Sequence, residues 1–440
     1  MSKIGMVSLG CPKNQMDAEL MLAKLRDAGF DITADAETAD AVIINTCGFI
    51  GDAKQEAIDT ILEFAERKQA GQIRAIVVTG CLAQRYQDEV ARELPECDAV
   101  LGLGANADIV ETVRAVLNGE TVQRFPSLSC WSLDGDRVQT TPFYFAYLRV
   151  GDGCNNRCTY CAIPLIRGGL RSRAMESVVA EAEALAASGV KELVLVAQDT
   201  TLYGVDRAGK SLLPELLDRL CEIEGLRWIR LLYCYPEHIT EELVEVIVRQ
   251  EKVVKYLDIP IQHASGRVLR AMNRPGDRDS LTGLMKRLRE CIPDLVLRTT
   301  VMVGFPGETE ADFEELCEFI REVRFERLGC FAYSPEEGTP AAEMASQVEE
   351  RVKERRRDTV MELQTRIADT YGDAQVGRTV AVLVEGFDQR EQCWFGRSAA
   401  DAPDIDPRVF FATEEPVEPG EFVNVRITDR LDWDLLGERV

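Results

Sequence analysis

Short apolar runs alternate with amphipathic segments over the first 122 residues of the chain. The apolar runs lie at residues 4–9, 41–46 and 75–80, and the segments between them, 15–28 and 53–67, carry apolar side chains every three or four positions. Runs of this length are typical of buried strands, and a period of 3.6 is typical of helices. The alternation predicts a doubly wound parallel sheet flanked by helices.

The same alternation resumes at residue 144, after a linker at 123–143 that is rich in turn-forming residues, and it continues to about residue 345. The candidate strands of this part are 144–150, 192–197, 228–233, 256–261, 295–303 and 327–333. Six strand-helix units predict an open, partial (β/α)6 barrel. Its active site would lie at the carboxyl ends of the strands.

A long amphipathic helix is predicted at residues 346–372, as a connection to a β-rich terminal part. Its basic run, residues 353–357, could contact RNA, although a solvated helix face is the interpretation that we favour. From 373 to 440 the alternating runs are short, at 379–385, 393–397, 408–411 and 422–427, with turn formers at 416–420. This part is predicted to close as a five-stranded antiparallel barrel.

Composition indicates a multidomain globular protein. The 440 residues are 46% hydrophobic and 29% charged, and no apolar run approaches the roughly 20 residues that span a bilayer. The chain begins with a predicted strand and not with a signal segment, so we expect a cytoplasmic protein. Fourteen cysteines in such a protein point to metal or redox chemistry.

The net charge of −24 argues against broad, nonspecific binding of nucleic acid, which depends on cations that displace counterions from phosphates. A basic partner fits this charge better.

The chain has two histidines, His238 and His263, so a histidine base has few candidates, and we interpret His263 as structural.

One loop carries three closely spaced cysteines, Cys154, Cys158 and Cys161. Zinc would need a fourth protein ligand at similar range, and no cysteine or histidine pair follows in the next forty residues. A four-iron four-sulfur cluster that is held by three cysteines keeps one iron open. We therefore favour the cluster over zinc or a disulfide framework.

Three more cysteines, Cys11, Cys47 and Cys81, each lie one or two residues past the end of a predicted strand of the first domain. The carboxyl ends of neighbouring parallel strands meet at one edge of a sheet, so these residues should converge. The alternative is that they are small buried hydrophobic residues. Convergence predicts a second cluster with three protein ligands.

The spacing of the loop cysteines, with Tyr160 before the last of them, resembles the signature of radical S-adenosylmethionine enzymes. The resemblance implies that the open iron chelates the cosubstrate, and that one electron cleaves it to a deoxyadenosyl radical. Tyr160 and residues at the predicted strand ends could then line the cosubstrate pocket: Gln198, Asp199, 233–236, Gln262, His263, Arg298, Gly304, Gly307 and Glu308.

Some of these residues have simpler interpretations. The segment 304–307 could be only a turn that caps a helix, and Asp199 and Arg298 could pair with each other or with water. Cys130 and Trp131 in the linker receive no chemical role. The remaining cysteines are interpreted as packing residues: Cys97, Cys221, Cys234, Cys291, Cys317 and Cys330.

Residues 8–14, 45–49 and 79–81 resemble the amino-terminal domain of the methylthiotransferases, and the resemblance continues through the whole chain. It implies that Cys11, Cys47 and Cys81 hold an auxiliary four-iron cluster that carries sulfur. It further implies that a second S-adenosylmethionine supplies the methyl group, and that proteins donating electrons and sulfur are partners.

The terminal barrel resembles a TRAM domain, which many relatives use to hold RNA. In this chain, residues 373–440 contain fifteen Asp and Glu against seven Arg and no Lys, a net charge of 7 − 15 = −8. Phosphate binding asks for cations, so RNA is not expected to be the primary substrate. A basic protein surface would be attracted instead.

Residues 11–14 and 396–406 resemble the RimO branch of the methylthiotransferases. That branch implies a methylthio group on the β-carbon of an aspartate in ribosomal protein twelve of the small subunit, a strongly basic protein. The alternatives are a transfer-RNA adenosine methylthiotransferase and, more distantly, a noncatalytic iron-sulfur or zinc protein.

Overall fold

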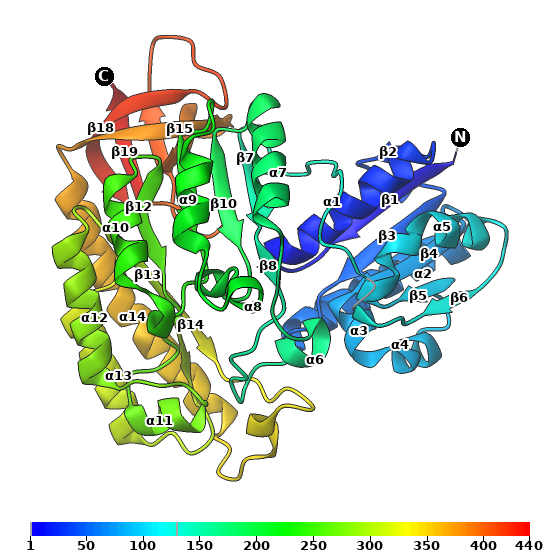
Figure 1. The fold of residues 1–440 in the computed structure, drawn as a ribbon, viewed down its shortest axis with the longest axis horizontal. Coiled ribbons are helices and arrows are strands. Elements are labelled where there is room, and N and C mark those ends of the chain that lie inside the picture. The colour runs from blue at the N-terminus through cyan, green and yellow to red at the C-terminus, as the bar shows by residue number, and fades with distance from the viewer. Residues whose placement is uncertain (1, 129–130) are drawn as a thin grey trace. The chain divides into compact units, whose positions relative to one another are not determined.

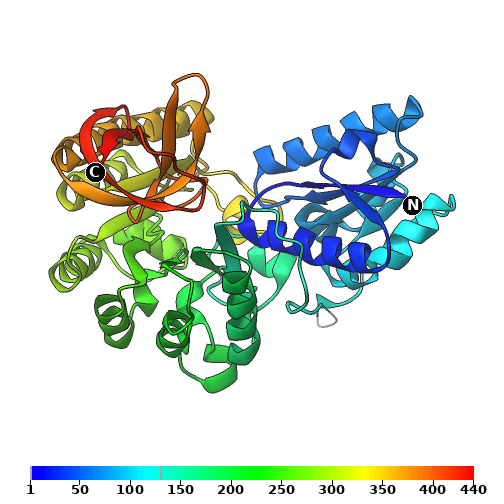
Figure 2. The same cartoon turned by 90° about the horizontal axis from the view of Figure 1, so that it is seen from above.

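The computed structural model describes residues 2–128 and 131–440, coloured along the chain in Figures 1 and 2. Contacts divide the chain into two compact units. The N-terminal unit comprises residues 1–141, 151–173 and 334–342, and the C-terminal unit comprises 142–150, 174–333 and 343–440. The loop with the closely spaced cysteines therefore packs with the first sheet, although it directly follows the first strand of the second sheet.

The N-terminal unit is built on a six-stranded sheet in which every pairing is parallel, in the order β2-β1-β3-β4-β5-β6. The strands are β1 (Lys3–Ser8), β2 (Asp31–Thr33), β3 (Ala41–Thr46), β4 (Ala75–Gly80), β5 (Ala99–Leu101) and β6 (Val122–Arg124). The sheet thus continues two residues past the boundary predicted at 122. Strands β3 and β4 are buried throughout, which explains why their sequences are unbroken apolar runs.

Helices cover both faces of this sheet, as a doubly wound fold requires (Figure 1). They are α1 (Pro12–Asp27), α2 (Gly51–Gln69), α3 (Cys81–Tyr86), α4 (Asp88–Glu93) and α5 (Ile109–Leu117). Ile43 and Val77 of the sheet pack with Met21 of α1, and Ile44 packs with Ile61 of α2 on the opposite face. The sheet order reverses around β1, so β1 and β3 flank the switch point where such folds bind ligands.

A second parallel sheet organises the C-terminal unit, with six strands in the order β14-β13-β12-β11-β10-β7. The strands are β7 (Phe145–Arg149), β10 (Glu192–Val196), β11 (Trp228–Leu231), β12 (Val253–Asp258), β13 (Val296–Val303) and β14 (Arg327–Ala332). Successive strands are neighbours, and the first and last are not paired, so the predicted open arrangement of six strand-helix units is confirmed. The helices between them are α7 (Met175–Ala187), α9 (Leu213–Cys221), α10 (Glu241–Arg249), α12 (Arg278–Cys291) and α13 (Glu310–Val323).

Helix α14 (Glu350–Gln375) leads to a closed barrel in the order β15-β16-β17-β19-β18. Its strands are β15 (Thr379–Asp388), β16 (Cys393–Ser398), β17 (Val409–Ala412), β18 (Phe422–Leu431) and β19 (Asp434–Arg439). The five-stranded barrel agrees with the prediction, but β17 and β19 pair in parallel, so the barrel is not wholly antiparallel. Its core includes Val382, Val409 and Phe411.

The described part of the chain has no helix that combines the length and the apolarity needed to cross a membrane.

Candidate functional site

The three strand-end cysteines converge at the carboxyl edge of the first sheet. Cys11 precedes α1, Cys47 directly follows β3, and Cys81 opens α3 after β4. A Cβ atom added at Gly10, whose φ is +88°, would lie 2.9 Å from the Sγ atom of Cys47. Only a glycine lets the loop before Cys11 approach Cys47 so closely.

Buried polar side chains hold these three loops against one another. The Asn14 amide donates to the backbone oxygen of Leu9 at 2.8 Å, and the Asn45 amide donates to the backbone oxygen of Asn14 at 2.7 Å. The Thr46 hydroxyl donates to the backbone oxygen of Thr79 at 2.6 Å. Hydrogen bonds therefore join the loops near the three cysteines, and they fix the backbone that carries the thiols.

The second cysteine set occupies the loop between β8 (Gly151–Asp152) and α6 (Ile163–Arg167), within the N-terminal unit. The backbone nitrogen of Cys154 donates to the oxygen of Gly168 at 3.1 Å, and that of Cys161 donates to Cys158 at 3.0 Å. The loop therefore folds back on the segment after α6. Strands β8 and β9 (Arg171–Ser172) pair antiparallel at its base.

Burial disfavours the thiolate form of three of these cysteines. Burial raises the pKa of Cys81 and of Cys161 to about 12, and it also raises the pKa of Cys47. Neighbouring thiols of the same set contribute to these rises, whereas Arg167 opposes the rise of the Cys81 pKa. Bound metal would supply the charge that deprotonates them.

Three cysteines in each set match the number of protein ligands of an open four-iron cluster. Within residues 2–128 and 131–440, no three His, Cys, Asp or Glu side chains are placed closely enough to hold one metal ion. Zinc needs its ligands around a single centre. The cysteines of a four-iron cluster bind separate irons and lie farther apart. The two sets, which we call the strand-end triad (Cys11, Cys47, Cys81) and the loop triad (Cys154, Cys158, Cys161), could each hold such a cluster.

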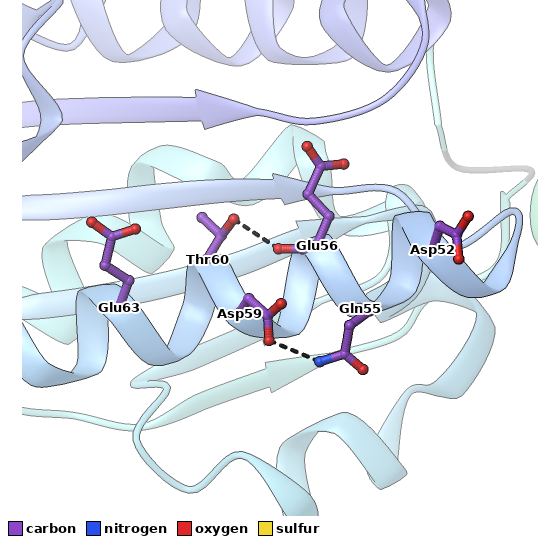
Figure 3. Close-up of a pocket in the computed structure, with 6 residues that line it drawn as sticks. All are labelled: Asp52, Gln55, Glu56, Asp59, Thr60 and Glu63. Carbon is purple, nitrogen blue, oxygen red and sulfur yellow. Dashed lines mark hydrogen bonds between the residues drawn. The ribbon is translucent and has the colours of Figure 1, made fainter.

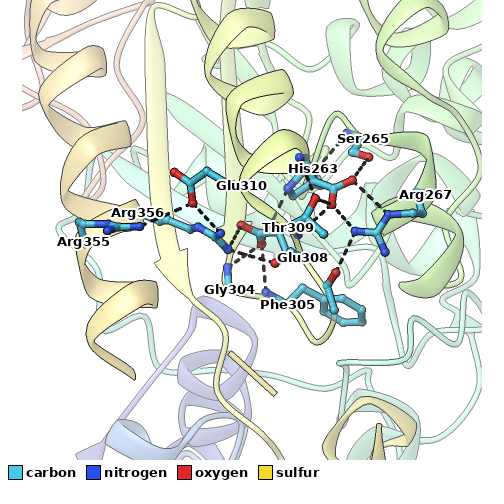
Figure 4. Close-up of polar contacts among 12 residues, drawn as sticks. His263, Ser265, Arg267, Gly304, Phe305, Glu308, Thr309, Glu310, Arg355 and Arg356 are labelled. Carbon is cyan, nitrogen blue, oxygen red and sulfur yellow. Dashed lines mark hydrogen bonds and ion pairs between the residues drawn. The ribbon is translucent and has the colours of Figure 1, made fainter. Parts of the chain in front are cut away.

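The predicted turn at Gly304 is closed by its own glutamate (Figure 4). Glu308 accepts hydrogen bonds from the backbone nitrogens of Gly304, at 2.6 Å, and of Phe305, at 3.1 Å. Arg356 of α14 pairs with the same carboxylate at 2.9 Å. Burial raises the pKa of Glu308 to about 7, and Arg356 opposes this rise. Gly304 and Gly307 have φ values of +74° and +77°, which a turn of this shape requires.

His263 lies against this turn and is fully buried. Its Nδ1 atom accepts a hydrogen bond from the backbone nitrogen of Ser265 at 2.9 Å, and its Nε2 atom lies 3.8 Å from Glu308. Burial lowers the pKa of His263 to about 3. A neutral, enclosed imidazole agrees with the structural role predicted for this histidine.

Asp199 and Arg298 each have a partner, but not each other. His238 Nδ1 lies 2.9 Å from Asp199, and the hydroxyl of Thr201 also bonds this carboxylate. Burial would lower the pKa of His238, but Asp199 raises it overall. Arg298 is the third residue of β13 and pairs with Asp258 at 2.6 Å. Its guanidinium is partly exposed, is engaged by the enclosed carboxylate of Asp258, and does not lie at the carboxyl end of its strand.

Three family models match the chain: "Uncharacterized protein family UPF0004" at residues 3–102, "Radical SAM superfamily" at 148–320 and "TRAM domain" at 376–440. A protein of Lachnoclostridium phytofermentans is 48% identical over 436 residues, covering 99% of both chains. A protein of Pelotomaculum thermopropionicum is 50% identical over 441 residues, covering 100% of this chain and 99% of the other. Both relatives are ribosomal protein uS12 methylthiotransferases named RimO. The chain belongs to the RimO family.

Among solved structures, the radical S-adenosylmethionine methyltransferase TsrM from Kitasatospora setae matches with a TM-score of 0.58 and 15% identity. The match covers 78% of this chain and 77% of that one. At this identity the likeness shows the fold alone, and it agrees with the predicted fold class.

Two buried ionic groups near the cysteines of this RimO family member were missed from the sequence. Glu336 pairs with Arg85 and with Lys54, each at 2.9 Å, and Arg85 also donates to the backbone oxygen of Gly48 at 2.9 Å. The second group surrounds Arg167, one cation in the otherwise apolar helix Ile163–Arg167. A single charge in a short apolar segment, just after the loop triad, was the signal that could have revealed it.

Two hollows lie on the N-terminal unit. One, on the solvent side of α2, is lined by the acidic residues Asp52, Glu56, Asp59 and Glu63 and contains no cysteine (Figure 3). The other is lined by Gly10, Cys11 and Gln15 among others, so one thiol of the strand-end triad borders a surface depression.

The other predicted packing residues are mostly enclosed. Cys97, Cys234, Cys317 and Cys330 are buried, whereas Cys221 is partly exposed and Cys291 is exposed. Trp131 packs in a cluster with Cys81, and Cys130 lies outside the described residues.

In the basic run of α14, Lys353 and Arg356 are buried, so only part of that run faces solvent.

Proposed function

We propose that this RimO family enzyme is a radical S-adenosylmethionine methylthiotransferase, which adds a methylthio group to the β-carbon of an aspartate in ribosomal protein uS12. The observation that carries the proposal is the presence of two cysteine triads in one compact unit of a chain 46–50% identical, over its whole length, to uS12 methylthiotransferases. An aliphatic C–H bond offers no acid-base route, so a radical route fits. We place the reaction in the cytoplasm.

The six cysteines are assigned by this proposal. The loop triad would hold the cluster at which S-adenosylmethionine binds, and the strand-end triad would hold the auxiliary cluster. When bound, the two clusters and S-adenosylmethionine supply a hydrogen-abstracting radical and a methylated sulfur. Proteins that donate electrons and sulfur complete the system.

The chain itself contributes burial and orientation. Hydrogen bonds between its loops hold the strand-end triad at the carboxyl edge of the sheet, where Cys47 and Cys81 are buried. Cys11 borders a surface depression. Such a depression offers a path by which sulfur and a substrate side chain could reach the triad. Protection of the remaining thiols limits side reactions with water.

Cosubstrate binding is assigned to residues near the loop triad and at strand ends. Tyr160, Gln198, Asp199, Gly304 and Gly307 remain candidates, because they follow the first, second and fifth strands of the sheet. Asp199 and Arg298 are the weakest of the predicted residues, since His238 and Thr201 bond the Asp199 carboxylate and Asp258 pairs with the Arg298 guanidinium.

The acidic barrel would attract the basic substrate. Asp401 pairs with Arg327 inside the protein, so the charges available to a partner are others. The connection between β17 and β18 carries the exposed carboxylates of Glu414, Glu418 and Glu421, and also Glu415, which pairs with Arg439 at 3.0 Å. Clustered charge of one sign raises the association rate with a complementary partner and is screened by salt.

Charge reversal tests this docking role. Replacing Glu414, Glu418 and Glu421 by Lys should lower kcat/KM for uS12 several-fold at low salt and leave kcat nearly unchanged. The matched control reverses Glu56, Asp59 and Glu63 on α2. Equal losses in the two variants, or a loss that does not shrink in high salt, would argue against the barrel as the docking site.

The function is tested by offering both substrate classes to the reconstituted enzyme. With S-adenosylmethionine, a reductant and a sulfur source, uS12 should gain one methylthio group in place of a hydrogen, located to an aspartate by fragmentation. Transfer RNA under the same conditions should remain unmodified. Modification of the RNA alone would replace the proposal with its transfer-RNA alternative.

A further inference from the structure

Arg167 lies at the end of α6, six residues after the last cysteine of the loop triad, and its side chain is almost entirely buried. Its guanidinium pairs with Asp17 of α1 and with Asp152 of β8, each at 2.9 Å, and both carboxylates are fully enclosed. All of these residues belong to the N-terminal unit. Arg167 therefore connects the segment that carries the loop triad to the helix that follows Cys11.

The same guanidinium faces a thiol of the strand-end triad. The Nη2 atom of Arg167 lies 3.4 Å from the Sγ atom of Cys81 and 3.4 Å from the amide oxygen of Asn14. The ring of Trp131 lies 5.4 Å from the guanidinium carbon. A cation next to sulfur in such an enclosed place acts through a low effective dielectric, so its effect on the charge of that sulfur is large.

The two carboxylates fix the direction in which the guanidinium points. Asp152 binds Nη1, whereas Asp17 shares Nη2 with Cys81. A planar guanidinium held at both ends cannot turn away from the thiol, and a lysine could not reproduce this fork. One guanidinium thus serves two buried carboxylates and also contacts a thiol.

We propose that Arg167 is a positioning residue for the strand-end cluster, donating a hydrogen bond to Sγ of Cys81 when this sulfur is an iron ligand and stabilising the reduced form of that cluster. The inference rests on the assignment of Cys11, Cys47 and Cys81 in the proposed function. Hydrogen bonds and positive charge at a ligand sulfur favour the state with the extra electron, and so raise the reduction potential.

The test uses full-length protein in which Cys154, Cys158 and Cys161 are replaced by Ala, so that only the strand-end cluster is present. The reduction midpoint is then measured by an electron paramagnetic resonance titration. Arg167→Met in this background should shift the midpoint to lower potential, decreasing the ratio of reduced to oxidised cluster about tenfold at the parent's midpoint, which equals 59 mV for one electron. Arg167→Lys should give a smaller shift in the same direction.

A second variant should shift the reduction midpoint in the opposite direction. Asp17→Asn leaves the guanidinium less neutralised, so the midpoint should rise, whereas a purely structural role predicts no such reversal. The matched control is Lys68→Met, because Lys68 is a half-buried cation of the same unit but pairs with Asp98, at 2.6 Å, and shares no partner with Arg167. Its midpoint should equal the parent's.

The outcomes separate this inference from the proposed function. A parent that binds no cluster overturns the assignment of the strand-end triad and the inference with it. A loaded parent whose midpoint is unchanged by Arg167→Met, or by Asp17→Asn if the first variant does not retain iron, overturns only the role of Arg167.

Discussion

Arg397 of the terminal barrel and Glu192 of the parallel sheet form a fully enclosed ion pair, with Nη2 and Oε2 2.7 Å apart. Glu192 is the first residue of β10 and also pairs with Arg230 at 2.7 Å. Arg397 belongs to the segment 396–406, by which the sequence resembles the RimO branch. That segment therefore anchors the barrel to the sheet within the C-terminal unit.

Breaking this anchor should destabilise the C-terminal unit strongly. Arg397→Met leaves the buried Glu192 and the partly buried Glu385 with one partner fewer, and removing one member of a buried pair costs about 3–5 kcal/mol. Urea unfolding measures the loss. The matched control is Arg426→Met on the same barrel, whose partner Glu438 is exposed, and its cost should be below about 1 kcal/mol. Equal costs would contradict the anchoring role.

The iron content should follow the two triads. Wild-type protein reconstituted without oxygen should hold about eight irons, the sum of two four-iron clusters. Replacing Cys154, Cys158 and Cys161 by Ala should leave about half of this iron and abolish cleavage of S-adenosylmethionine. The buried Cys97 serves as the control, since Cys97→Ala should retain all the iron. Normal cleavage by the triple variant would refute the assignment of the loop triad.

His263 should make stability depend on pH. Its pKa is about 3 in the folded protein, because it is buried, against about 6.5 when unfolded, so between these values the unfolded chain binds more protons. Its contribution to the free energy of unfolding is complete above about pH 6.5 and falls by about 1.4 kcal/mol per unit as pH decreases. His263→Gln should lack this component. Parallel pH profiles for the two proteins would contradict the buried, neutral imidazole.

Gly304 should tolerate no side chain. Its φ of +74° disfavours other residues, and an added Cβ would overlap the side chain of Lys353. Gly304→Ala should therefore lower the free energy of unfolding by about 1–3 kcal/mol. Gly283 in α12 has open space around it, so Gly283→Ala should be neutral or stabilising by up to about 1 kcal/mol. Similar values for both variants would show that the turn adapts.

Much of the fold follows from local pattern. The bounds of β3 and β4 were predicted to the residue, because each is a buried apolar run that ends at a cysteine loop. The convergence of Cys11, Cys47 and Cys81 followed from the rule that parallel strands end at one edge. The last barrel strand, Asp434–Arg439, was not recognised, because its polar residues give it little alternation.

Contacts between residues distant in sequence could not be predicted in this way. The loop triad joins the N-terminal unit partly through Arg167 and Asp17, which are 150 positions apart. Arg298 is predicted to line the cosubstrate pocket as a strand-end residue, but it lies early in β13, and its partner depends on register with the neighbouring strand, where Asp258 is opposite. A single sequence contains no direct record of such pairings.

The most direct test of the proposed function is mass spectrometry of ribosomal protein uS12 from cells with and without this gene. Cells that contain the gene should yield uS12 with a methylthio group on the β-carbon of one aspartate. Deletion, or replacement of Cys11, Cys47 and Cys81 by Ala, should return that aspartate to its unmodified mass. An identical, fully modified uS12 in the deletion strain, or an unmodified uS12 in both, would contradict the account.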